Sequence, residues 1–288
     1  MYSPQFDYYR AKSVQEAGTL LEQHPGAKLL AGGHTLIPLM KLRLATPSAV
    51  IDIGRIGELK GIDAKGGIVR IGALTTHAEL AASAVLREQC PALAEAAGHV
   101  GDPAVRNRGT IGGNVAHADP ASDLPTVLTA LGARFVVTSG AGQRTIAVDQ
   151  FFTGLMATAL GDGDLLTAIE VPAQAAGQGS AYVKFEHPAS RYAVIGVAAV
   201  LGVSGGSCTS AAVAIGGLVP RPMRTSAVER KLSGQTISDA ALASAAAEVA
   251  ADLKGDIIGD LYASAEYRKA VAPVWVRKAL AAAAARVR

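Results

Sequence analysis

The sequence is poor in cysteine, with Cys90 and Cys208 as the two cysteines among 288 residues. They lie far apart in the chain, and neither belongs to a CxxC pair. This excludes an iron–sulphur cluster or a structural zinc site built from this chain alone. Any metal redox centre that works with this chain must belong to a partner.

The chain also lacks a strong net charge and a long hydrophobic run. The formal charge of +3 is spread along the sequence, without the basic stripe that nucleic acids require. The apolar run from Tyr192 to Val203 is too short for a membrane-spanning helix, which needs about 20 residues. The residues from Met1 to Asp7 lack a basic segment followed by an apolar one, so we expect a cytoplasmic protein.

Several familiar catalytic and nucleotide motifs are missing. There is no GxGxxG after a strand and no GxxxxGK[ST], so a nucleotide would have to bind in a fold other than a Rossmann or P-loop domain. No GxSxG motif supports hydrolase chemistry. The four histidines between His34 and His117 are too scattered for a metal motif.

The residues that are present predict an α+β protein. A capping-box pattern at Ser13–Glu16 predicts a helix toward Gln23. Short apolar runs and turn residues predict further elements in the first part of the chain. The expected strands are 28–31, 49–53, 68–74, 134–139 and 165–171, and the expected helices are 36–44, 124–131 and short pieces after Thr76 and Pro91.

A loose stretch at 173–179 predicts a boundary between two domains, 1–177 and 178–288. The first divides into subdomains of about 1–55 and 56–177. In the second we expect strands at 182–187, 194–203 and 209–218, the last two joined by a Gly205–Gly206 turn. Helices follow at 240–253 and from about Ser264, with a kink or break near Pro273. This is a small domain with a three-stranded antiparallel sheet and a helical bundle.

Between Asp102 and Asp123, Gly, Asn, Asp and Pro are so frequent that neither helical nor strand periodicity is visible. A long irregular segment in a compact protein is usually functional.

The first glycine-rich segment is Ala31–Thr35, which follows an expected strand. Glycines let the backbone approach a ligand closely, and free N–H groups at the next helix start can bind phosphate oxygens. The alternative interpretation is a tight strand-to-helix turn without a ligand.

The second glycine-rich segment, Thr110–Asn114, supplies small residues, a hydroxyl and an amide that suit the wrapping of a diphosphate. The carboxylates of Ala118–Pro125 are candidates to accept hydrogen bonds from a ribose or an adenine. Asp123 is equally a candidate helix N-cap. Two such segments in one chain favour a nucleotide site over two unrelated turns.

These residues resemble the flavoprotein medium subunit of carbon monoxide dehydrogenase and its xanthine dehydrogenase relatives. The resemblance is carried by Ala31–Lys41 and Thr110–Asn114, and it extends to Asp119–Pro125, Leu165–Pro172 and Tyr182–Lys184. It covers essentially the whole chain in order, and the paired glycine motifs at this separation are specific.

The resemblance implies a two-part FAD-binding domain of the vanillyl-alcohol-oxidase (PCMH) type, followed by a carbon monoxide dehydrogenase flavoprotein C-terminal domain. It also implies the residues that contact FAD, none of which acts as a catalytic acid or base. The diphosphate contacts would be Gly32, Gly33, His34, Thr35, Leu36, Thr110, Ile111, Gly112, Gly113 and Asn114, and the other contacts would be Asp123, Leu166, Lys184 and Tyr192.

Two of these positions have alternative roles. Tyr192 falls where a relative places an aromatic ring against the isoalloxazine, but it is equally a tyrosine at the start of a core strand. Lys184 is an expected FAD contact by resemblance, whereas a lysine is in general more often a solvated surface residue. Thr35 stands where the family commonly has serine, and the Arg191–Tyr192 context differs, which leaves the substrate open.

The resemblance implies the FAD subunit of a molybdenum hydroxylase, an FAD-dependent oxidoreductase subunit. Partner subunits, a small iron–sulphur one and a large molybdenum one in a dimer of heterotrimers, would deliver electrons that this chain passes through FAD to an external acceptor. A stand-alone flavin oxidoreductase of the same fold and a cofactor-free scaffold are the alternatives. Neither the substrate (carbon monoxide, a purine, an N-heteroaromatic or an aldehyde) nor the physiological electron acceptor is written in the sequence.

Overall fold

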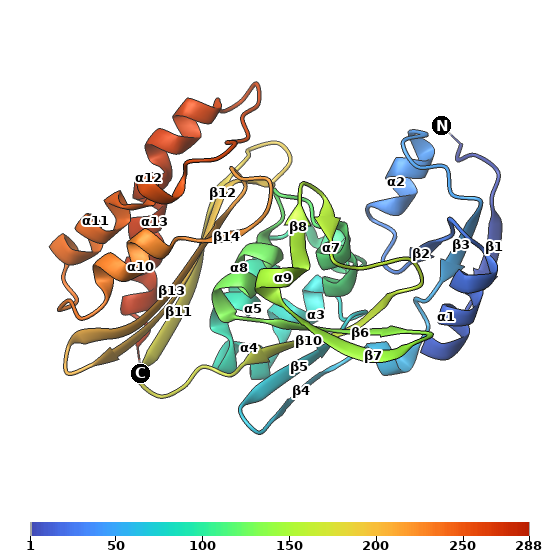
Figure 1. The fold of residues 1–288 in the computed structure, drawn as a ribbon, viewed down its shortest axis with the longest axis horizontal. Coiled ribbons are helices and arrows are strands. Elements are labelled where there is room, and N and C mark those ends of the chain that lie inside the picture. The colour runs from blue at the N-terminus through green and yellow to red at the C-terminus, as the bar shows by residue number, and fades with distance from the viewer. Residues whose placement is uncertain (1, 288) are drawn as a thin grey trace.

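The computed structural model describes residues 2–287 and divides them among three neighbouring parts (Figure 1). The first part is a small three-stranded parallel sheet in the order β1-β3-β2 with two helices. Its elements are β1 (Asp7–Arg10), α1 (Val14–Gln23), β2 (Lys28–Leu30), α2 (Leu36–Lys41) and β3 (Ala49–Asp52). Ile51, Ile53 and Ala17 are buried in its core.

The start of α1 carries half of the predicted capping box. The Ser13 hydroxyl accepts a hydrogen bond from the N–H of Glu16, 3.1 Å away. The Glu16 carboxylate accepts from the N–H of Lys12, one residue before the cap. The predicted helix is confirmed.

The second part is a five-stranded antiparallel sheet in the order β4-β5-β10-β6-β7, with a group of short helices on one face. β10 lies at its centre, where Ile169 pairs with Ile71 on one side and Phe135 on the other. The elements are η1 (Gly57–Leu59), β4 (Ile62–Lys65), β5 (Ile68–Gly72), α3 (His77–Ala82), α4 (Ala84–Gln89), α5 (Pro91–His99), α6 (Pro103–Arg106), α7 (Ile111–His117), α8 (Asp123–Leu131), β6 (Arg134–Ser139), β7 (Gly142–Ala147), α9 (Val148–Phe151), β8 (Phe152–Gly154), β9 (Ala157–Thr158) and β10 (Leu165–Pro172).

The third part begins after 173–177 with an antiparallel sheet, in which β12 is buried on both faces. The long helix α13 packs on one face, and α5 and α8 of the second part pack on the other. This explains the nearly continuous apolar sequence of β12. The elements are β11 (Gln178–Glu186), β12 (Ala193–Ser204), β13 (Ser207–Gly216), β14 (Met223–Arg224), α10 (Ser226–Leu232), α11 (Asp239–Ala247), α12 (Val249–Asp252) and α13 (Ala265–Ala284).

Three details of the sequence prediction are wrong. The third sheet has four strands, because the two-residue β14 pairs with β13. The helix predicted at 240–253 is divided into α11 and α12. The helix α13 is continuous through Pro273, so the predicted alternative of a break is wrong, whereas that of a kink stays a prediction. The carbonyl that loses its partner belongs to the exposed Lys269, where water can hydrate it.

The segment 102–123 is also more regular than its composition predicts. Asp102 caps α6 by accepting a hydrogen bond from the N–H of Val105, and Thr110 caps α7 by accepting one from Gly113. The Gly112–Gly113 pair therefore lies in a helix and not in a loop. No helix within residues 2–287 is long and apolar enough to cross a membrane.

Candidate functional site

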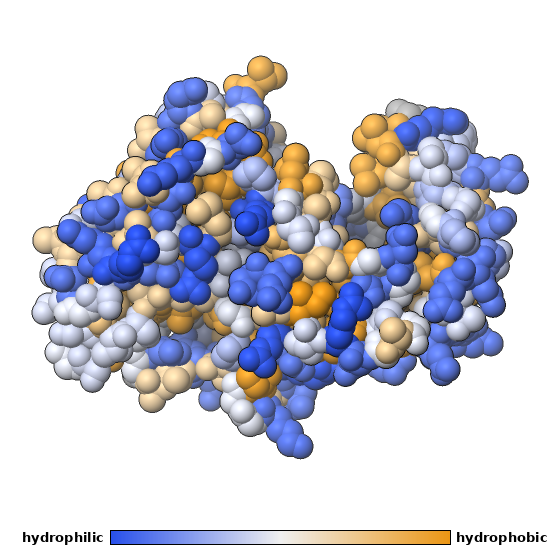
Figure 2. Space-filling view, in the orientation of Figure 1, coloured by the Kyte–Doolittle hydropathy of each residue, from blue (hydrophilic) through white to orange (hydrophobic). Residues whose placement is uncertain are grey.

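A cavity of about 600 Å³ lies where the three parts meet. Figure 2 shows the surface hollowed between the lobe that carries α2 and the rest of the molecule. One wall comes from residues 27–39, a second from 100–123, and a third from the loop 160–164 and from Ser190, Arg191 and Tyr192 before β12. A volume of this size is typical of a cofactor site.

The first glycine-rich segment forms an open backbone cradle on one wall. Among the hydrogen bonds within residues 2–287, the N–H groups from Gly32 to Leu36 donate none. Gly33 has a φ of +78°, a conformation that favours glycine. The Thr35 hydroxyl makes no capping hydrogen bond with α2. This segment therefore presents unused donors to the cavity, as an anion requires.

The second glycine-rich segment is bound tightly to the protein. The N–H of Ile111 donates to the carbonyl of Thr75, and that of Gly112 donates to Ala73. A Cβ at Gly112 would lie 2.6 Å from the Cβ of Ala73, so a larger residue does not fit. The glycine lets α7 pack directly against the backbone after β5.

The two segments touch each other through backbone atoms. A Cβ at Gly32 would overlap the carbonyl oxygen of Arg108 and lie 3.1 Å from the Cα of Gly109. Glycine at position 32 thus brings a part of the first subdomain against the residues that precede α7. The cavity wall is continuous across this junction.

Asn114 points an unused acceptor into this region. Its Nδ2 donates to the Ser122 hydroxyl at 3.1 Å, whereas its buried Oδ1 has no hydrogen-bond partner among the residues that the structure describes. An unpaired buried polar atom costs free energy unless a ligand or water pairs with it. Asn114 lines the cavity, so a bound ligand is a natural partner.

Asp123 is the cavity residue that is most strongly connected to the third part. The Tyr182 hydroxyl donates to its Oδ1 at 2.6 Å, and Lys184 Nζ lies 3.0 Å from its Oδ2. Burial raises the pKa of Asp123, and Lys184 and Tyr182 oppose that effect by stabilising the carboxylate. Burial also raises the pKa of Tyr182 well above its ordinary value, which keeps its hydroxyl a donor.

The alternative role of Asp123 as an N-cap is wrong, because Ser122 occupies the cap position and Asp123 is the first residue of α8. The alternative of a solvated Lys184 is wrong as well, since its side chain is 1% exposed. Lys184 also donates to the carbonyl of His99. Through these two contacts, Lys184 of β11 holds Asp123 of α8 and the end of α5 together next to the cavity.

Most of the predicted site residues are brought together on the cavity wall. Those that line it are Gly32, Gly33, His34, Thr35, Leu36, Thr110, Gly112, Gly113, Asn114, Asp123, Leu166 and Tyr192. Two predicted residues do not line it. Ile111 is fully buried in the core of the second part, and Lys184 reaches the site through Asp123.

Tyr192 lies on the rim and not in a core strand. It is half exposed and precedes β12, after Arg191 with a φ of +61°. The side chain is available to cover a ligand in the cavity. This position agrees with the expected flavin contact and not with the core alternative.

His77 is a cavity residue that the sequence reasoning missed. It lines the cavity as the first residue of α3, directly after the N-cap Thr76, which forms a capping box with Glu79. Burial, together with nearby His34 and Arg106, lowers the pKa of His77 to about 4. The capping box predicts the helix start, but nothing in the local sequence shows that this position faces the two glycine segments.

The family comparisons match the chain in two consecutive parts. Residues 4–174 match the FAD binding domain in molybdopterin dehydrogenase, and residues 180–283 match the CO dehydrogenase flavoprotein C-terminal domain. The carbon monoxide dehydrogenase medium chain of Hydrogenophaga pseudoflava is 41% identical over 99% of both chains.

Solved structures agree over the same length. A chain of carbon monoxide dehydrogenase from Hydrogenophaga pseudoflava, in a form that lacks the Mo-pyranopterin moiety of the molybdenum cofactor, superposes with a TM-score of 0.95, 42% identity and full coverage of both chains. A chain of quinoline 2-oxidoreductase from Pseudomonas putida 86 gives a TM-score of 0.93 at 31% identity, with 99% of both chains covered. The chain therefore belongs to the family of FAD-binding flavoprotein subunits of molybdopterin dehydrogenases, the family of the carbon monoxide dehydrogenase medium chain.

Proposed function

We propose that this chain is the FAD-binding subunit of a molybdenum hydroxylase complex and passes electrons from partner iron–sulphur clusters through FAD to an external acceptor. The observation that carries the proposal is the cradle of unused N–H groups from Gly32 to Leu36 on the wall of a 600 Å³ cavity. A dinucleotide with a negatively charged diphosphate fits such a cradle.

The residues of the cavity suit FAD in their chemistry. The cradle and the Thr35 hydroxyl would hold the diphosphate, and the unpaired Oδ1 of Asn114 would accept a hydrogen bond from the cofactor. Asp123, held by Tyr182 and Lys184, would face the cofactor's ribose or adenine. Tyr192 on the rim would cover the flavin ring.

Bound FAD would supply a centre that takes up electrons singly and releases them in pairs. The chain's own residues bind and orient the cofactor, and no side chain is required as an acid or base toward a substrate. Cys90 and Cys208 are buried in two different cores, so they do not supply the ligands of an iron–sulphur cluster. Following the family resemblance, we assign the clusters and the molybdenum centre to a small and a large partner subunit, in a dimer of heterotrimers.

The stand-alone oxidoreductase alternative requires a substrate pocket in the third part. The strands that would form it lie between two helical layers, and β12 is buried almost throughout. This packing favours the subunit role. The cytoplasmic location expected from the sequence stays a prediction.

The test is purification from the native host, followed by an optical spectrum, metal analysis and mass analysis. We expect FAD, iron and molybdenum together with two further chains. A colourless single chain that is unable to bind added FAD would contradict the proposal. A chain that binds FAD but purifies without partners would favour the stand-alone alternative.

A further inference from the structure

His77 carries a buried imidazole with an unpaired ring nitrogen. The residue is 3% exposed, and its Nδ1 has no hydrogen-bond partner within residues 2–287. Its backbone is fixed, because its N–H donates to the carbonyl of Gly109 at 3.0 Å and the capping box holds the start of α3. The ring is therefore held in a defined place without being used by the protein.

The ring lies behind the junction of the two glycine-rich segments. A Cβ at Gly109 would lie 2.8 Å from Cδ2 of His77, and Gly109 itself lies against Gly32. His77 and Gly109 both line the cavity. The imidazole is thus placed beside the cradle of unused N–H groups that would hold the diphosphate.

For the stability of the fold alone, an apolar residue would be more favourable than histidine at position 77. A buried polar group without a partner costs free energy, and a leucine of similar size would remove that cost. The imidazole is also neutral at neutral pH, because burial and the nearby His34 and Arg106 lower its pKa to about 4. A neutral imidazole carries one N–H that can donate to a ligand.

We propose that His77 is an additional cofactor contact, whose neutral imidazole donates a hydrogen bond to the diphosphate-bearing half of bound FAD. The inference rests on the proposed function, since it requires that the cavity binds FAD. Bound FAD would then receive hydrogen bonds from two sources. The first glycine-rich segment would supply backbone N–H donors, and His77 of α3 would supply a side-chain donor next to the contact between Gly32 and Gly109.

The test compares the full chain with the variants His77→Leu and His77→Gln, each stripped of flavin and titrated with FAD, ADP and riboflavin. His24→Leu is the control, because His24 stacks on Tyr9 in the first part and does not line the cavity. Loss of one hydrogen bond from the imidazole to the charged diphosphate should raise the Kd of His77→Leu for FAD about 10- to 100-fold. The Kd for ADP should rise equally, that for riboflavin should not change, and His77→Gln should recover part of the affinity.

Thermal unfolding without ligand separates this role from a structural one. His77→Leu should unfold at the same temperature as the parent chain or a higher one at pH 7.5, because no hydrogen bond is lost. An unchanged Kd for FAD and ADP in His77→Leu would overturn the inference and leave the proposed function intact. A loss of riboflavin affinity with unchanged ADP affinity would also overturn it, whereas failure of the parent chain to bind FAD would instead overturn the proposed function.

Discussion

The two glycine-rich segments of the cavity have similar sequences but use glycine for different physical reasons. In Gly32–Leu36 the N–H groups are unused, and the glycines allow a left-handed turn and a close approach to Arg108. In the second segment the N–H groups of residues 111–114 are bonded to the protein, and Gly112 allows contact with Ala73. A Gly-Gly pair can therefore indicate a ligand cradle or a tight packing contact.

This difference assigns cofactor binding to the backbone of the first segment and positioning of the wall to the backbone of residues 111–113 in the second. Changes at residues 111–113 and the residues behind them should lower mainly the stability of the whole chain. Changes in the first segment should in addition lower FAD affinity. The predictions below test that division.

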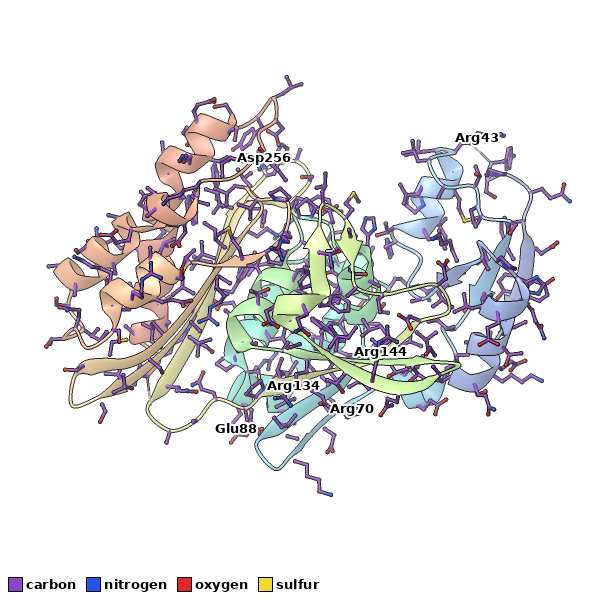
Figure 3. The ribbon with its side chains drawn as sticks, in the orientation of Figure 1. Arg43, Arg70, Glu88, Arg134, Arg144 and Asp256 are labelled. Atoms are coloured by element: carbon purple, nitrogen blue, oxygen red, sulfur yellow. The ribbon has the colours of Figure 1, made fainter. Side chains whose placement is uncertain are left out.

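The largest effect is expected for Lys184→Met, which removes the partner of buried Asp123. Breaking a buried ion pair from one side costs about 3–5 kcal/mol, because the remaining charge is left without compensation. Chemical denaturation should show this loss in the free energy of unfolding. Arg70→Met is the control and should cost at most about 1 kcal/mol, since the exposed Arg70 (Figure 3) pairs with Glu170 near the surface. Equal losses in the two variants would contradict the role of Lys184 in holding Asp123.

The second prediction concerns the stability of the chain at acidic pH. The folded-state pKa of His77 is about 4, below its ordinary value of 6.5, so the unfolded chain binds more protons between these two values. Stability from this group is complete above pH 6.5 and is lost as the pH falls toward 4, by about 3 kcal/mol. The free energy of unfolding of the flavin-free chain, measured from pH 7.5 to 4, should fall less in His77→Leu than in the parent chain. Identical pH profiles would show that His77 is not buried in its neutral form.

The third prediction compares the two glycine segments directly. Gly112→Ala should destabilise the chain by about 1–3 kcal/mol, the usual cost of forcing extra atoms into packed structure. Gly32→Ala should cost stability as well, because its added methyl overlaps the carbonyl oxygen of Arg108. It should in addition raise the Kd for FAD, because the methyl separates the cradle from Arg108 and Gly109. Unfolding and FAD titration of both variants check the contrast. The prediction would be contradicted if the two variants lost stability and FAD affinity in the same proportion.

The smallest effect is expected at Thr35, whose hydroxyl is not used to cap α2. Thr35→Val keeps the shape but removes the hydroxyl, and should weaken FAD binding about 3- to 10-fold. Thr35→Ser keeps the hydroxyl and should bind as the parent chain does. Equal affinities in all three chains would show that the hydroxyl does not contact the cofactor.

The long apolar elements were predictable because their burial is visible in the sequence. The run at 194–203 is apolar throughout, and the structure buries β12 between two helical layers. The short strands β8, β9 and β14 were missed because two or three residues carry no periodicity. The helix α7 was missed because glycines are poor helix formers, and here packing against Ala73 overrides that preference.

The sequence by itself determined the fold class, the family and a set of site residues most of which lie on the cavity wall, because these depend on local patterns of burial, turns and glycine motifs. The tertiary structure decided which N–H groups are free, how Lys184 acts through Asp123, and why His77 belongs to the site. These features depend on contacts between residues far apart in the chain. Hydrogen bonds and desolvation act at such contacts, and no local pattern records them.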